Sequence, residues 1–301
     1  MRSLAILIMI GVQGKPISEN DCVEVNEKHL LHPVPSALIR EHCHRSLEMI
    51  NTRPWATDFG LAKDLILNDV VPFTVLTEPP FLNQTKRSLL ADFVDYITSA
   101  CEDILCVAQE LNDKVWNVRE PPIVFQPAPP NELNSYSVED TWDSGNGSCT
   151  AMSVFLVTAL RLAGAPARIA GTPHWNLGPE KCPHGDSSAA CGNHNWVEVY
   201  IPDRGWSFVD QRRPDKRVLP LNQSWFAPEW LRGLDRTLNH SVFAASFIPP
   251  PELEQYPRGA DVRVASYYPM VWDWGNQKIA AWDMSAVYSV EDTPVTVIET
   301  S

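Results

Sequence analysis

Apolar residues recur at helical spacing through the first third of the chain. Residues 36–50, SALIREHCHRSLEMI, repeat apolar positions every three or four residues, and residues 87–118 do so over eight turns or more. The two patterns predict helices, with one long helix over 87–118. The Pro-rich stretch 120–134 has no helical period, so we expect an extended connection into the next unit.

The pattern beyond this connection predicts one helix followed by three strands. Residues 150–163 are again helical, and Gly164 and Pro166 end that helix. Alternating apolar and polar positions then predict three strands, at ARIAGT (167–172), NHNWVEVYI (193–201) and GWSFVD (205–210). Two more strand-like runs follow, DVRVASYYP (261–269) and QKIAAWDMSAVYSV (277–290). The fold class expected from these patterns is α+β.

The same patterns divide the chain into four stretches. Residues 1–14, MRSLAILIMIGVQG, combine a basic start with an apolar run too short to cross a bilayer, which predicts a cleaved secretory signal peptide. A buried first strand is the alternative. We expect a helical N-terminal region over 15–125, a helix-and-strand core over 126–240, and a small β-rich C-terminal region over 241–301.

Charge narrows the range of partners. The chain has 24 basic and 37 acidic residues and a formal net charge of −13, so it should repel nucleic-acid backbones and anionic lipid. No segment has 18 consecutive apolar residues, so no stable membrane insertion is expected. Sequons for N-glycosylation occur at positions 83, 146, 222 and 239. With the predicted signal peptide, they favour a secreted or extracytoplasmic glycoprotein.

The cysteine count is odd. Seven cysteines occur, at positions 22, 43, 101, 106, 149, 182 and 191. In an oxidising compartment one thiol must therefore remain unpaired. Cys182 with Cys191 is the most natural pair, and Cys22 with Cys43 and Cys101 with Cys106 are possible. Cys101 and Cys106 are five apart in a helical pattern, which is poor geometry for a bridge on a straight helix. Pairing of neighbours leaves Cys149 free.

The stretch GNGSC, residues 145–149, predicts a helix that begins at Cys149. Gly145 and Gly147 allow a tight bend, and Ser148 can cap the helix. A thiol in the first turn lies near unpaired backbone amides and the positive end of the helix dipole, which favour the thiolate. The same amides could bind a developing oxyanion. The alternative for Cys149 alone is an inert buried thiol.

A base and an orienting carboxylate are expected on two neighbouring strands. His194 begins the strand NHNWVEVYI, and Asp210 ends GWSFVD sixteen residues later. If the turn PDRG joins these strands in antiparallel fashion, the two side chains come level with one another. Asp210 could then hold the imidazole in the tautomer that serves Cys149.

Three motifs together resemble the transglutaminase-like superfamily. They are GSCTAMSVFLVTALRLAGAPARIAGT, GNHNWVEVY and GWSFVD, and the similarity covers roughly residues 140–235. The resemblance implies a papain-like α+β core in which a helix packs on an antiparallel sheet. It also implies Cys149 as nucleophile, His194 as general base and Asp210 as orienting carboxylate. In that superfamily an acyl group passes to the cysteine as a thioester and is released by an amine or by water.

The sequence departs from the animal enzymes of that group. Thr150 follows the nucleophile where they usually have Trp, and no calcium-binding loop is present, so no cofactor is expected. Trp116, Gln126 and Trp142 are candidates for an upstream oxyanion donor, although each fits a packing or loop role better.

A zinc site is the alternative for one cluster of residues. Cys182, His184, Cys191 and His194 have the side chains and the spacing of a tetrahedral zinc site. In a secreted chain the two cysteines would more often be oxidised together, so we expect no metal.

The function expected from the sequence is cysteine-dependent acyl transfer on protein or peptide amides. Hydrolysis by a cysteine peptidase or amidase is the alternative with water as acceptor. A second alternative is a binding module of the same fold without catalysis.

Overall fold

The computed structural model describes about three fifths of the chain, including the helix and strands that carry the predicted site. The described residues are 17–57, 62–127, 136–173, 193–202, 204–211, 221–222, 241–249, 268 and 279–288. The predicted signal peptide, Cys182, Cys191 and most of the predicted strand 261–269 lie outside them.

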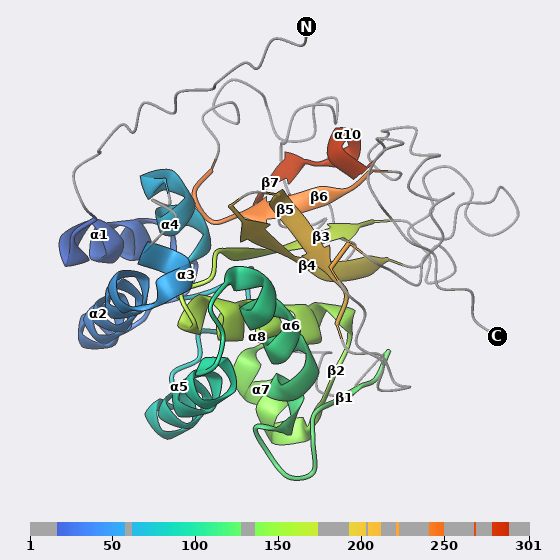
Figure 1. Cartoon of the computed structure of the whole chain (residues 1–301), viewed down its shortest axis with the longest axis horizontal. Coiled ribbons are helices and arrows are strands. Elements are labelled where there is room, and N and C mark those ends of the chain that lie inside the picture. Colours follow the sequence, from blue (N-terminus) through green and yellow to red (C-terminus); the bar gives the residue numbers. More distant parts are fainter. Residues whose placement is uncertain are drawn as a thin grey trace, which may run out of the picture.

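Helices dominate the first half of the described chain and strands the second (Figure 1). The helices are α1 (Glu19–His29), α2 (Ser36–Thr52), α3 (Pro54–Thr57), α4 (Lys63–Asp69), α5 (Gln84–Thr98), α6 (Ile104–Lys114), α7 (Val138–Ser144), α8 (Cys149–Leu162) and α10 (Ser285–Tyr288), with a 3-10 turn at Val115–Asn117. The strands are β1 (Val124–Phe125), β2 (Asn146–Gly147), β3 (Ala167–Thr172), β4 (His194–Ile201), β5 (Gly205–Val209), β6 (Phe243–Ser246) and β7 (Ala280–Asp283). Among the helices described, none is long and apolar enough to cross a membrane.

One antiparallel sheet of five strands organises the molecule. Its strand order is β5-β4-β3-β6-β7, so the predicted helix and three strands around residues 150–210 are confirmed. β6 and β7 belong to the stretch 241–301, and β6 pairs directly with β3 through Gly171 and Phe243. The C-terminal strands therefore extend the sheet that carries His194.

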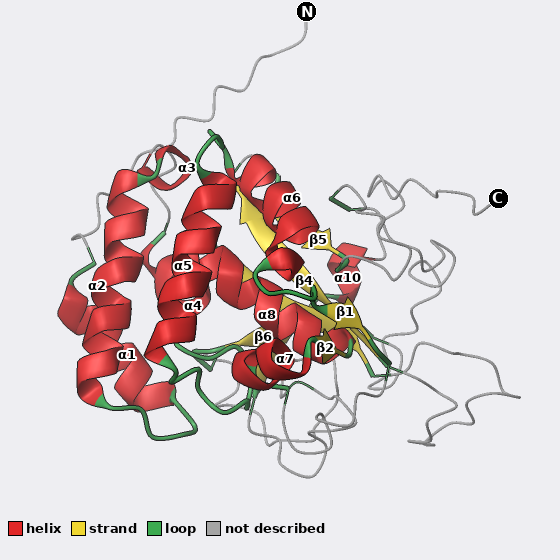
Figure 2. Ribbon diagram, turned by 90° about the horizontal axis from the view of Figure 1, so that it is seen from below, coloured by secondary structure: helices red, strands yellow, loops and turns green. Residues whose placement is uncertain are grey.

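The helix α8 lies on one face of this sheet, and α5 and α6 pack against α8 (Figures 1 and 2). Alternation along β3 and β4 explains the two faces, because Ile169 and Val197 enter the core beneath α8 whereas Ala170 and Trp196 pack on the opposite face with Tyr288 of α10. α8 is apolar on nearly every side and is buried between the sheet and the helices α5 and α6. The fold is α+β, as predicted.

The stretch 87–118 forms two helices, so the prediction of one long helix is wrong. α5 ends at Thr98, and α6 starts only at Ile104. The side chain of Asp103 caps α6 by accepting from the backbone N–H of Cys106 at 2.7 Å. Apolar positions keep their helical spacing across the break because both helices pack against the same core. Periodicity alone therefore did not show the break.

The break also changes the geometry available to two cysteines. Cys101 lies in the connection rather than on a straight helix, and it forms a disulfide with Cys106 across a Cα–Cα distance of 5.5 Å. A second disulfide joins Cys22 of α1 to Cys43 of α2 across 5.8 Å. Both possible pairings are confirmed. Cys149 is the free cysteine of the described part of the chain.

In the stretch 277–290, predicted as strand, the described residues 279–288 are strand only over Ala280–Asp283. The carboxylate of Asp283 accepts from the backbone N–H of Ser285 at 2.9 Å, and the short helix α10 follows. The backbone N–H of Met284 donates to Val242 O at 2.8 Å, which holds this change of direction against the sheet.

Candidate active site

The start of α8 presents Cys149 in the first turn of a buried helix. α7 ends at Ser144, and Gly145 follows as its C-cap with a φ of +70°, a left-handed conformation that favours glycine. Ser148 then caps α8, since its hydroxyl accepts from the backbone N–H of Thr150 at 3.1 Å. Cys149 is the first residue of the helix, so its sulfur lies near the positive end of the dipole.

His194 and Asp210 meet across two neighbouring strands. His194 is the first residue of β4, and Asp210 follows the last residue of β5. The antiparallel pairing of Val197 with Val209 brings these ends together, and His194 Nε2 lies 3.2 Å from Asp210 Oδ1. A carboxylate only accepts, so Nε2–H donates to it and Nδ1 is left for Cys149. The structure therefore brings the three predicted residues together.

Electrostatics favour charge separation between Cys149 and His194. Burial raises the pKa of the Cys149 thiol, but the hydrogen bond to His194 and its positive charge outweigh burial, so the pKa is lowered overall. Burial also lowers the pKa of His194. The charge of Asp210, its hydrogen bond to the imidazole and the contact with Cys149 reverse this and raise the pKa of His194 to about 10. The arrangement supports a thiolate beside an imidazolium.

Two amide side chains that sequence reasoning missed hold the helix start against the strands. Asn195 Nδ2 donates to Thr150 Oγ1 at 2.8 Å and lies 4.0 Å from Cys149 Sγ. Gln211 Nε2 donates to the backbone oxygens of Cys149 at 3.2 Å and Asn195 at 3.0 Å, and also to Ser153. These bonds tie α8, β4 and the end of β5 into one unit around the sulfur.

Tyr268 fixes the direction of the Asn195 amide. Its hydroxyl donates to Asn195 Oδ1 at 2.6 Å, which turns Nδ2 toward Thr150 and Cys149. Gly171 of β3 makes room for this contact, since a Cβ there would lie 2.6 Å from Asn195 Oδ1 and 2.7 Å from the Tyr268 hydroxyl. A glycine inside a predicted strand was the available signal, because it often marks a close approach of other groups.

The three upstream candidates for an oxyanion donor have other roles. The indole N–H of Trp116 donates to Asn112 O at 2.6 Å, so this donor is already used. Trp142 packs against the core next to Phe155. The backbone N–H of Gln126 donates to Gly147 O in the pairing of β1 with β2.

The described residues contain no group of three or more metal-ligating side chains. Three members of the alternative zinc set, Cys182, His184 and Cys191, lie outside the described residues. The fourth, His194, is within hydrogen-bond distance of Asp210.

A cysteine at the start of a buried helix, facing a histidine and an aspartate on an antiparallel sheet, defines a transglutaminase-like α+β core. Comparison with protein families agrees, because residues 91–211 match the model of the transglutaminase-like superfamily. The match covers less than half of the chain. The match begins within α5 and ends at Gln211, so it includes Cys149, His194 and Asp210.

Two solved structures illustrate the range of similar proteins. One is the periplasmic domain of TgpA from Pseudomonas aeruginosa bound to ethylmercury, with 25% identity and a TM-score of 0.30, over 44% of this chain and 45% of that one. The other is red sea bream transglutaminase, with 16% identity and a TM-score of 0.34, over 52% of this chain and 33% of that one. This chain thus spans less than half the length of either protein. None of the curated protein sequences matches it significantly.

Proposed function

We propose that this protein is a cysteine-dependent acyl-transfer enzyme that acts on protein or peptide amides through a thioester. The observation that carries the proposal is the free thiol of Cys149 at the start of α8, hydrogen-bonded to a histidine that is itself 3.2 Å from a buried carboxylate. The match of residues 91–211 to the model of the transglutaminase-like superfamily supports the same class of chemistry.

The first half-reaction forms the thioester. The Cys149 thiolate attacks the carbonyl carbon of the amide, and a C–S bond forms as the carbonyl oxygen becomes an oxyanion. His194 donates its proton to the leaving nitrogen, the C–N bond breaks, and ammonia or an amine departs. Asp210 holds the ring and stabilises its positive charge before that proton is given away.

The second half-reaction releases the acyl group. An incoming amine or water loses a proton to the now neutral imidazole of His194 and attacks the thioester carbonyl. The C–S bond breaks, the thiolate of Cys149 is restored, and the product is a new amide or a carboxylic acid. An amine acceptor gives a crosslink, and water gives hydrolysis.

Two donors of this chain could stabilise the oxyanion. The backbone N–H of Cys149 belongs to the first turn of α8, where amides have no partner within the helix. The second is Asn195 Nδ2, which lies 4.0 Å from the sulfur and is oriented by Tyr268. Donors aimed at this charge typically contribute about 3 to 4 kcal/mol each in acyl transfer.

The two disulfides support an extracytoplasmic site of action. Cys22–Cys43 and Cys101–Cys106 form and persist in oxidising compartments, and thiols of cytosolic proteins are normally kept reduced. We therefore propose a protein or peptide substrate outside the cytoplasm. Together with the predicted signal peptide, this makes secretion the expected route.

The deciding experiment offers the protein a glutamine-containing peptide together with a labelled primary amine. Ammonia release, amine incorporation and free peptide acid are followed in parallel. We expect ammonia release by the wild type and its loss in Cys149→Ala, which removes the nucleophile. His194→Ala should lower kcat/KM by at least about a hundredfold, because proton transfer by a positioned base contributes that much or more.

His44→Ala is the matched control, because His44 is an exposed histidine of α2. It should leave turnover unchanged. Peptide acid without amine incorporation would identify a hydrolase of the same mechanism. Equal turnover by the wild type and Cys149→Ala, or no turnover and no reactive thiol in the wild type, would refute the proposal in favour of a non-catalytic binding module.

A further inference from the structure

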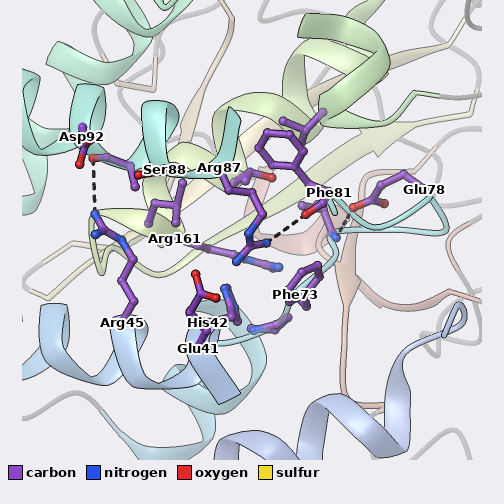
Figure 3. A pocket seen from close by; sticks show the side chains of 16 residues that line it. Glu41, His42, Arg45, Phe73, Glu78, Phe81, Arg87, Ser88, Asp92 and Arg161 are labelled. Carbon is purple, nitrogen blue, oxygen red and sulfur yellow. Dashed lines mark hydrogen bonds between the residues drawn. The ribbon is translucent and has the colours of Figure 1, made fainter. Parts of the chain in front are cut away.

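A cavity of about 130 Å³ lies beside the C-terminal end of α8, at the opposite end of this helix from Cys149. Its wall is formed by α2, α5, the last turns of α8 and the segment 72–81 (Figure 3). A water molecule occupies about 30 Å³ in the liquid, so the cavity has room for several waters or one small ion.

Two guanidinium groups line this cavity and are held by uncharged acceptors. Arg161 is 5% exposed, and its Nε donates to Ala167 O and its Nη1 to Thr74 O, both at 2.9 Å. Arg87 Nη1 donates to Phe81 O at 3.2 Å. Each guanidinium has five N–H donors, so several donors on each remain after these bonds.

The arginines come from different elements and reach the same space. Figure 3 shows the side chains of Arg87 from α5 and His42 from α2 directed into the cavity, which Arg161 of α8 also lines. Arg87 lies over the ring of Phe73, 4.5 Å from its centroid, which holds it in this direction. Arg45 also lines the cavity, and its Nε is a buried donor without a partner among the described residues.

The carboxylates around the cavity do not form ion pairs with these two arginines. Both oxygens of Glu78 accept backbone N–H groups, from Val75 at 2.6 Å and Leu76 at 2.7 Å. Glu41 and Asp92 are exposed. Within the described part of the chain, no ion pair includes Arg87 or Arg161. The buried guanidinium of Arg161 and the partly buried guanidinium of Arg87 therefore lack a bonded counter-charge, which is costly for Arg161 above all unless an anion supplies one.

Burial is the main influence on the titratable groups of the lining. It lowers the pKa of Arg87 to about 10 against the opposing charge of Glu41, and the pKa of Arg161 to about 10 against the opposing charges of Asp69 and Glu78. Burial also lowers the pKa of His42 to about 3, and the neighbouring charges of Arg87, Arg161 and Arg45 act in the same direction. With its pKa lowered this far the His42 ring is neutral at ordinary pH, and its Nε2–H donates to Val71 O at 3.0 Å.

We propose that this cavity binds one small tetrahedral oxyanion, phosphate or sulfate, between Arg87 and Arg161, and that the ion holds α5 to the last turn of α8. The planar fork of a guanidinium matches two oxygens of such an ion. The small volume of about 130 Å³ favours the free ion over a phosphate group carried by a peptide. The acidic residues Glu41 and Asp92 on the exposed side of the lining also disfavour larger, highly charged ligands.

Calorimetry tests this proposal on the full chain. Sodium phosphate is titrated into the wild type at constant ionic strength in a chloride buffer, and the melting temperature is measured in parallel. We expect saturable binding of one ion per chain and a rising melting temperature. Arg87→Met keeps the apolar stem over Phe73 but removes the fork, and should weaken phosphate binding about tenfold or more, as loss of a charge-assisted pair does.

Arg40→Met is the matched control, because Arg40 is an exposed arginine of α2 outside the cavity. This variant should bind phosphate with the affinity of the wild type. Equal weakening in both variants, or no saturable binding by the wild type, would overturn the proposal. If Arg87→Met does not fold, wild-type crystals are grown with sodium selenate and their anomalous scattering is measured. An anomalous peak between Arg87 and Arg161 would support the site, and an empty cavity would reject it. A phosphoserine peptide that binds as tightly as phosphate would overturn the assignment to a free ion.

Discussion

At the scale of single residues, the proposed chemistry depends on three groups whose charges are coupled. Cys149 and His194 each have a pKa that burial alone would shift toward the neutral form, and each is shifted the other way by its neighbour. Asp210 is 3% exposed, and its negative charge favours the imidazolium form of His194 beside the sulfur of Cys149. The pair is therefore expected to exist as thiolate and imidazolium over a broad pH range.

Alkylation of Cys149 by iodoacetamide tests this coupling. The thiolate is the reactive form, so the rate in the wild type should rise with a midpoint below that of a free cysteine, about 8.5. His194→Ala removes the positive charge and leaves burial, so the midpoint should move above that of a free cysteine. A wild-type midpoint equal to that of a free thiol would contradict the coupling.

The same coupling sets an upper limit for activity. Because the pKa of His194 is raised to about 10, the ring keeps its proton until the pH approaches that value. Above it the thiolate remains but the proton for the leaving nitrogen is lost, so kcat/KM should fall as the pH rises through about 10.

At the scale of elements, short contacts decide where helices begin and end. α6 starts at Ile104 because Asp103 caps it, and the disulfide between Cys101 and Cys106 spans the break before it. α1 and α2 are joined by the disulfide Cys22–Cys43, whose cysteines are completely buried in a second apolar cluster. This cluster is separate from the core around α8. Its disulfide should therefore affect the free energy of unfolding more than the proposed activity at Cys149.

Removing the disulfide of the N-terminal helices tests that separation. Its cysteines are 21 residues apart, and restricting the unfolded chain over such a loop stabilises a protein by ~3 kcal/mol. Cys22→Ala with Cys43→Ala should lower the free energy of unfolding in urea by that amount. Cys101 and Cys106 are only five residues apart, so replacing both should lower the free energy of unfolding by less. A larger loss for this pair than for Cys22 and Cys43 would show that loop length is not the cause.

At the scale of the whole molecule, the described cysteines divide into two disulfide pairs and one free thiol. Two disulfides are formed in the helical part of the chain, and Cys149 is free in the core. With seven cysteines in all, the two outside the described residues, Cys182 and Cys191, remain predicted partners. An oxidising compartment is consistent with this division.

Mapping of thiols in the folded, unreduced protein tests the division across the whole chain. We expect a thiol reagent to label Cys149 alone, and proteolysis without reductant to release one peptide pair joined through Cys182 and Cys191. Labelling of both Cys182 and Cys191, together with about one zinc per chain, would instead favour the tetrahedral zinc site.

Local patterns allowed much of this protein to be predicted from the sequence alone. A glycine-rich turn before an apolar run predicted the helix start at Cys149, and alternation predicted β3, β4 and β5 with their residues. The sixteen-residue spacing of His194 and Asp210 predicted that they meet, because two antiparallel strands joined by a turn place the start of the first beside the end of the second. Each of these features depends on neighbours along the chain.

Contacts between distant segments were decided only by the tertiary structure. The break before α6 keeps the apolar period on both sides, and β6 joins β3 from the far end of the sequence. Tyr268 reaches Asn195 from 73 residues away, and the lining that Arg87 and Arg161 share is formed by helices that are not adjacent in the chain. Periodicity reports which face of an element is buried, but it carries no information about which partner buries it.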